Sequence, residues 1–152
     1  MEYIQANKDE DSDAGCVLCR IRDGEESERV LARSGLGYVV LNKYPYNHGH
    51  VMVVPNRHVG DLEEFDDEES FELHRLLRRA VKALREEMEP HGFNIGVNIG
   101  RVAGAGVPDH LHWHVVPRWS GDANFMPVTG QTRVMPELLA ETAKRLAPRF
   151  AE

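Results

Sequence analysis

The sequence predicts an α+β protein with a mostly antiparallel sheet of about five strands, one long helix and a shorter C-terminal helix. Short runs rich in β-branched residues lie in the first and third parts of the chain, and one long amphipathic segment separates them. Strands and helices do not alternate as they would in βαβ units, which favours antiparallel pairing. The 152 residues suffice for one domain, expected over 15–152. We expect the acidic segment 1–14 to be mobile.

Five segments carry the strand pattern. A glycine-containing turn separates the first two, and the turn-rich connection "YPYNHG" leads into the third, which Pro55 closes. We expect Tyr44 and Tyr46 of this connection to fill the core. The strands are expected over residues 28–34, 37–43, 50–55, 93–100 and 110–119.

The long helix is expected to begin at the acidic residues "DDEE" (66–69), which supply an N-cap and negative charge at the positive end of the helix dipole. Pro90 and Gly92 end the helical pattern. A shorter helix is expected over "PELLAETAKRLAPR" (136–149). The apolar stripe of the long helix consists of Leu73, Leu76, Leu77, Ala80, Val81, Leu84 and Met88.

Composition and charge exclude some classes of protein. The net charge of -7 argues against a broad basic face for nucleic acid, although a local pocket for a small anion stays compatible with it. No apolar run approaches the roughly 20 residues that span a bilayer. The start "MEYIQANKDEDSD" lacks the apolar core of a secretion signal. We therefore expect a cytoplasmic protein that binds neither nucleic acid nor a membrane.

Three histidines alternate in "PDHLHWHVVPRW" (108–119): His110, His112 and His114. On a helix, residues two apart diverge by about 200°, so the three imidazoles would not converge. On a strand they share one face, while Leu111, Trp113 and Val115 share the other and pack on the core. The pattern therefore predicts a row of imidazoles on a polar face.

A second histidine cluster and a cysteine pair lie upstream. His48, His50 and His58 flank the third expected strand, in "YNHGHVMVVPNRH". The cysteines, Cys16 and Cys19, form "CVLC", a spacing that in a reducing compartment indicates metal or redox chemistry more often than a structural disulfide.

The glycine-rich stretch "GRVAGAG" (100–106) lacks the lysine and hydroxyl residue of a Walker loop. Its glycines, Gly104 and Gly106 among them, either let backbone N–H groups approach a phosphate or form a flexible connection.

The chain resembles the histidine triad nucleotide-binding (HIT) family, and in particular its bacterial diadenosine tetraphosphate hydrolases and phosphorylases. The resemblance rests on "HLHWHVV", "LNKYPYNHGHVMVVPNRH", "GFNIGVNIGRVAGAG" and "VPRWSGDANFMP", and covers about residues 16–136. It implies the HIT fold, a homodimer built around the main helix and a sheet edge, and nucleotidyl transfer at an α-phosphate.

The resemblance also implies a role for individual residues. His112 would attack phosphorus through one ring nitrogen to form a phosphohistidine intermediate. Its other ring nitrogen would donate to the backbone carbonyl of His110. His114 and His50 would donate to phosphate oxygens. Asn42 would hold the ribose, and Asn98 would face the phosphates or the leaving group. Some relatives carry Gln or Ser and then Ser or Thr just before the triad, where a hydroxyl can assist the leaving group. This chain has Gly106 and Val107 there, so backbone contacts would have to serve instead.

In the zinc-bearing branch of the superfamily, a CxxC pair is joined by two histidines. The matching residues here are Cys16, Cys19, His58 and His110. Two thiolates and two imidazoles suit tetrahedral Zn²⁺, and a site without an open position would be structural.

Three functions stay open at this point. The first is a triad enzyme that cleaves a nucleoside polyphosphate or phosphoramidate, with water (a hydrolase) or inorganic phosphate (a phosphorylase) attacking the intermediate. The second is a metalloenzyme that holds a catalytic zinc with the three triad histidines. The third is a nucleotide-binding protein without turnover.

Overall fold

The computed structural model describes residues 15–123 and 135–151 of the chain. The expectation of a mobile acidic segment at 1–14 lies outside these residues. Within the described ranges, none of the helices is both long enough and apolar enough to cross a membrane.

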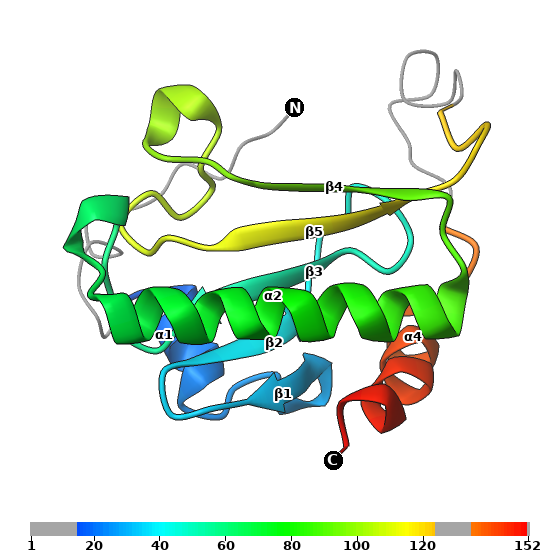
Figure 1. Ribbon diagram of the computed structural model, residues 1–152, viewed down its shortest axis with the longest axis horizontal. Coiled ribbons are helices and arrows are strands. Elements are labelled where there is room, and N and C mark those ends of the chain that lie inside the picture. The colour runs from blue at the N-terminus through cyan, green and yellow to red at the C-terminus, as the bar shows by residue number, and fades with distance from the viewer. Residues whose placement is uncertain (1–14, 124–134, 152) are drawn as a thin grey trace.

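A five-stranded sheet in the order β1-β2-β3-β5-β4 forms the centre of the structure (Figure 1). All four strand pairings are antiparallel, as the sequence predicts. β1 and β4 are the edge strands. The strands are β1 (Val30–Arg33), β2 (Gly37–Leu41), β3 (Val51–Pro55), β4 (Gly92–Val97) and β5 (Trp113–Arg118).

The long helix α2 (Asp67–Met88) lies lengthwise along one face of the sheet (Figure 1). The predicted N-terminal cap is present: the Asp66 side chain accepts from the Glu69 N–H, and the Glu69 side chain accepts from the Asp66 N–H. The shorter helix α4 (Leu139–Leu146) and the 3-10 turn Ala147–Phe150 close the chain. Buried side chains of α2, of four strands and of the C-terminal segment form the main core.

A short helix, α1 (Val17–Arg22), packs on the opposite face of the sheet and holds both cysteines in place. Leu18 and Ile21 of this helix join Tyr38, Val40 and Met52 of the sheet in a second apolar cluster. The Tyr38 hydroxyl donates to the Leu18 carbonyl at 2.7 Å. No helix was expected at α1, because six residues are too few to establish a helical repeat.

The last strand begins later than expected, at Trp113 instead of residue 110. Just before it, the chain bonds to loops instead of a strand: the Leu111 N–H donates to the Val59 carbonyl at 2.7 Å. β3 extends to Pro55 but pairs with β5 only through Val51–Val53, because β5 begins at Trp113, the residue that pairs with Val53. Of the three triad histidines, therefore, only His114 lies within a regular strand.

The expectation that Tyr44 and Tyr46 fill the core is wrong. Their side chains are 68% and 50% exposed, because the connection that carries them runs over the surface beside the triad.

Candidate active site and metal centre

His112 is held with one ring nitrogen bonded and the other available. Its Nδ1 lies 2.9 Å from the backbone carbonyl of His110, and because a carbonyl only accepts, Nδ1 carries the proton. The Nε2 atom therefore holds the lone pair. Burial lowers the pKa of His112, while the bond to the His110 carbonyl opposes that shift. A neutral, oriented imidazole of this kind can act as a nucleophile.

His114 is oriented by a chain of hydrogen bonds that begins at a backbone amide. The Tyr46 N–H donates to His50 Nδ1 at 3.0 Å, so the remaining proton of His50 is on Nε2. That N–H donates to His114 Nδ1 at 2.9 Å. His114 consequently carries its own proton on Nε2. Burial lowers the pKa of His114 to about 4, so the ring is a neutral N–H donor at pH 7.

His50 is fully buried. Its N–H points at His114, and through this bond His50 orients the His114 ring; the direct contact with phosphate that the resemblance implies stays a prediction. Asn42, just after β2, has its Nδ2 3.4 Å from His50 Nδ1, and its Oδ1 accepts from the Tyr44 N–H at 2.9 Å. The structure thus brings Asn42 close to the triad.

Asn98 follows the edge strand β4 and touches the glycine-rich loop, where its Nδ2 donates to the Gly104 carbonyl at 3.3 Å. Gly104 has a φ of 94°, a left-handed conformation that favours glycine. Gly106 has no such requirement, and a Cβ there would meet none of the described atoms within 4 Å. Val107 is partly buried and packs against the second apolar cluster, which Leu18 and Ile21 of α1 form with the sheet.

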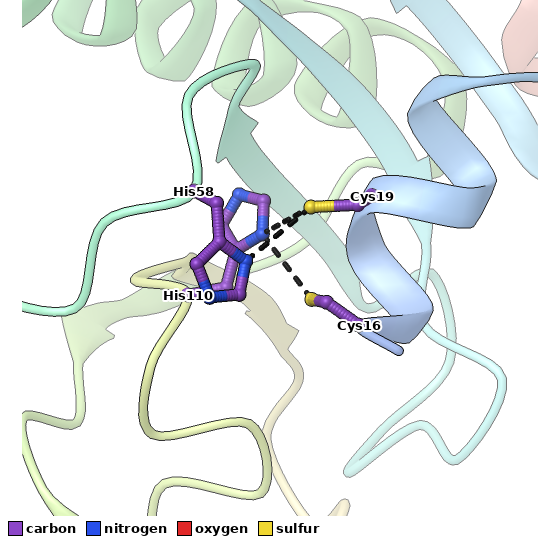
Figure 2. A group of neighbouring side chains, drawn as sticks. All are labelled: Cys16, Cys19, His58 and His110. Carbon is purple, nitrogen blue, oxygen red and sulfur yellow. Dashed lines mark hydrogen bonds between the residues drawn. The ribbon is translucent and has the colours of Figure 1, made fainter. Parts of the chain in front are cut away.

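Cys16, Cys19, His58 and His110 converge from three separate segments of the chain (Figure 2). One ligand atom from each residue fits within 4.8 Å of all the others. His110 Nδ1 lies 3.4 Å from both sulfur atoms, and His58 Nδ1 lies 3.4 Å from Cys19 Sγ. A tetrahedral zinc ion with ordinary Zn–S and Zn–N bonds would separate sulfur and nitrogen by about 3.5 Å. The four residues could therefore bind a metal of this size.

The second ring nitrogen of His110 supports the same interpretation. Its Nε2 lies 2.9 Å from the Pro55 carbonyl, so Nε2 carries the proton and the Nδ1 lone pair faces the thiols. Burial lowers the pKa of His110 to about 4, which keeps the ring neutral, as a metal ligand must be. His110 therefore serves two sites: its ring faces the cysteines, and its carbonyl orients His112.

A single zinc held by all three triad histidines does not fit the geometry. Among the described residues, the side-chain group able to hold a metal includes His110 but neither His112 nor His114. The Nδ1 atoms of those two residues are bonded to the His110 carbonyl and to His50.

Sequence reasoning missed the contacts that anchor the loop between β2 and β3. Asn47 donates from Nδ2 to the Pro117 carbonyl at 3.0 Å and to Asp122 Oδ2 at 2.8 Å. Arg118 donates to both oxygens of Asp122, and this pairing holds the pKa of that carboxyl well below its usual range. The Tyr46 ring lies against His50 and His114, with centroids 4.5 and 5.3 Å apart. The turn-forming composition of "YPYN" was the only sequence signal for this anchored loop.

Known proteins resemble this chain both in sequence and in structure. An AP-4-A phosphorylase of Mycobacterium tuberculosis is 49% identical over 84% of this chain, and the chain spans 65% of the length of that relative. An adenosine 5'-monophosphoramidase of Schizosaccharomyces pombe is 31% identical over 68% of the chain and 74% of its own length. A Zn-bound histidine triad family protein from Mycobacterium smegmatis superposes with a TM-score of 0.75 over 91% of this chain and 95% of its own, at 28% identity.

The HIT domain model matches residues 23–121, which include the whole sheet and all three triad histidines. This match and the 49% identity over most of the chain show that the protein belongs to the histidine triad (HIT) family.

Proposed function

We propose that this protein transfers a nucleoside monophosphate from a dinucleoside polyphosphate, of the diadenosine tetraphosphate class, through a phosphohistidine on His112. The observation that carries this proposal is the orientation of His112, whose Nδ1–H is committed to the His110 carbonyl while Nε2 keeps its lone pair. The 49% identity to an AP-4-A phosphorylase supports the substrate class.

In the first step, His112 Nε2 attacks the α-phosphorus. A nitrogen–phosphorus bond forms, and the bond from phosphorus to the bridging oxygen of the leaving nucleotide breaks. The leaving oxygen departs with the electron pair of that bond. The Nε2–H of His114 hydrogen-bonds phosphate oxygens as negative charge develops on them, which stabilises the transition state more than the ground state. Asn42 holds the ribose, and Asn98 and backbone N–H groups around Gly104 and Gly106 contact the phosphates.

In the second step, an oxygen of inorganic phosphate or of water forms a bond to the same phosphorus while the nitrogen–phosphorus bond breaks. The electron pair of that bond returns to His112 Nε2, which restores the neutral imidazole, and an attacking water releases its proton to solvent. Water would yield a nucleoside monophosphate, and inorganic phosphate would yield a nucleoside diphosphate. We favour phosphate, because the relative at 49% identity is an AP-4-A phosphorylase. The test incubates the protein with diadenosine tetraphosphate, with and without phosphate, and separates the products. We expect ADP and ATP when phosphate is present. If no nucleotide is cleaved in either condition, the proposed function fails.

Replacing His112 with Asn separates this enzyme from a nucleotide-binding protein without turnover. Asparagine keeps an N–H that can donate to the His110 carbonyl but offers no nucleophilic nitrogen. We expect the His112→Asn variant to bind nucleotide and to lose turnover. A variant that cleaves at the parental rate would refute the covalent mechanism.

We further propose that the metal is a structural Zn²⁺ bound by Cys16, Cys19, His58 and His110. Two thiolates with two imidazoles are a common ligand set for zinc, and the Zn-bound M. smegmatis neighbour shares the fold. When bound, the ion would hold α1 and the segment before β5 together. A site with two thiolates needs reduced cysteines, which fits a reducing compartment such as the cytoplasm.

We also propose a homodimer formed through β4 and α2. β4 pairs with β5 on one side, and no described strand pairs with its other side. Ile95, on the face of β4 turned toward α2, is 50% exposed, since α2 does not extend over this edge. An open strand edge beside an apolar side chain is a typical site for pairing with a second copy. We expect the mass in solution to be that of a dimer and the Ile95→Lys variant to be monomeric.

A further inference from the structure

The face of β4 that looks onto the triad is bare next to His114. Gly96 pairs directly with His114 in the register of β4 and β5, and Asn94 pairs with Val116. Side chains of directly paired residues lie on the same face, with Cβ atoms about 4.5–5.5 Å apart. Any side chain at position 96 would therefore stand beside the imidazole of His114. Glycine leaves this place open.

The described structure gives no internal reason for glycine at this position. The φ of Gly96 is not in the left-handed region, and a Cβ placed there would meet none of the described atoms within 4 Å. Glycine in a strand interior also weakens the strand, because it loses more conformational freedom on folding and offers no side chain to pack. A strand glycine that is neither conformationally needed nor crowded allows close approach of a ligand, and at Gly96, unlike at Gly92, the open space lies beside His114.

Donor groups line this open strip. Asn98 uses one hydrogen of its amide nitrogen in the bond to the Gly104 carbonyl, and an amide nitrogen carries two. At the other end, Asn94 accepts from Arg118 through its Oδ1, so its amide nitrogen can donate toward the strip. In the register of β4 and β5, His114 lies between the positions of Asn98 and Asn94. Such a row of N–H donors suits an extended chain of phosphates.

We propose that Gly96 determines leaving-group specificity, by keeping open the strip beside His114 that the polyphosphate chain of the leaving nucleotide occupies. The inference rests on the proposed nucleotidyl transfer. It adds the position at which the polyphosphate of the leaving nucleotide binds. A small leaving group, such as the ammonia of an adenosine phosphoramidate, does not reach the strip. The exposed Ile95, which serves the proposed dimer, lies on the opposite face of the same strand.

The experiment compares two substrates in three proteins. The proteins are the parent, Gly96→Val and the matched control Gly92→Val. Gly92 lies on the same strand and the same face, four residue pairs from Gly96 in the register with β5, and is equally free of neighbours within 4 Å among the described atoms. kcat/KM is measured for diadenosine tetraphosphate and for adenosine 5'-phosphoramidate, together with thermal unfolding and mass in solution.

We expect Gly96→Val to lower kcat/KM for the tetraphosphate about tenfold or more relative to the phosphoramidate, as blocking a subsite does. Its melting temperature should equal or exceed that of the parent, because valine favours strands. Gly92→Val should leave the ratio unchanged. An unchanged ratio in Gly96→Val, an equal fall for both substrates, or a change of oligomeric state would overturn the inference while leaving the proposed function intact. If the parent cleaves neither substrate, the proposed function fails and the inference fails with it.

Discussion

Replacing His50 tests how the active site orients His114. In the structure His50 accepts from the Tyr46 N–H at 3.0 Å and donates to His114 Nδ1 at 2.9 Å. Leucine fills a similar volume but makes neither bond. Two buried hydrogen bonds contribute about 1 kcal/mol each, and an unpaired buried polar group adds a further penalty, so His50→Leu should lose about 2–4 kcal/mol of stability. For a chain of this size, we expect the melting temperature to fall by roughly 5–15 °C.

The same variant should slow the reaction. Without the His50 donor, the His114 ring is no longer biased toward the tautomer with its proton on Nε2, a bias of about 1 kcal/mol or more. We expect kcat/KM for diadenosine tetraphosphate to fall at least about fivefold, the factor that corresponds to about 1 kcal/mol. His50→Gln is the matched control, because its amide can donate to His114 and accept from Tyr46, so it should recover much of the rate. Calorimetry and initial rates measure both effects. The reasoning is refuted if leucine supports the parental rate, or if glutamine is no better than leucine.

Three further predictions concern the metal, the pH dependence of stability and the core. The purified protein should contain about one zinc per chain, which Cys16→Ser should release with a lower melting temperature; metal analysis showing no zinc in the parent would contradict the site. The pKa of His114 is about 4 in the folded protein and 6.5 ordinarily, so the unfolded chain binds more protons between these values, and stability should fall by up to about 3 kcal/mol as pH drops from 6.5 to 4. Denaturant titrations across that window should show the fall in the parent, and a smaller one in His114→Gln. Leu76→Ala, at a fully buried position of α2, should cost about 2–5 kcal/mol through the cavity it leaves, whereas alanine at the exposed Phe71 of the same helix should cost little.

The elements with long, regular patterns were predictable from the sequence. The limits of α2 follow from its N-terminal acidic residues and its apolar stripe, and the predicted N-cap takes the form of a capping box between Asp66 and Glu69. Four of the five strands lie within the expected segments, and β4 begins one residue before its own. The four candidate metal ligands were predictable because the resemblance to a zinc-bearing branch supplied all four positions. In the structure they converge.

What the sequence did not reveal depends on contacts between distant segments. His50 and His114 are 64 residues apart in the chain, so the hydrogen bond from His50 to His114 could not be deduced from sequence spacing. The late start of β5 depends on a bond from the Leu111 N–H to the Val59 carbonyl, in the loop that follows β3. Nothing in the sequence distinguishes Gly96 from other strand glycines, because its pairing with His114 depends on the register of β4 and β5.

The central claim is that His112 carries the nucleotide during the reaction, and trapping the intermediate tests it most directly. The protein is mixed with a substrate labelled at the α-phosphorus, quenched within the first turnover under alkaline conditions that preserve phosphohistidine, digested and analysed by mass spectrometry. We predict a nucleoside monophosphate on the peptide that contains His112, and none in the His112→Asn variant. A parent that turns over without a labelled peptide, or a label that persists in the variant, would contradict the account.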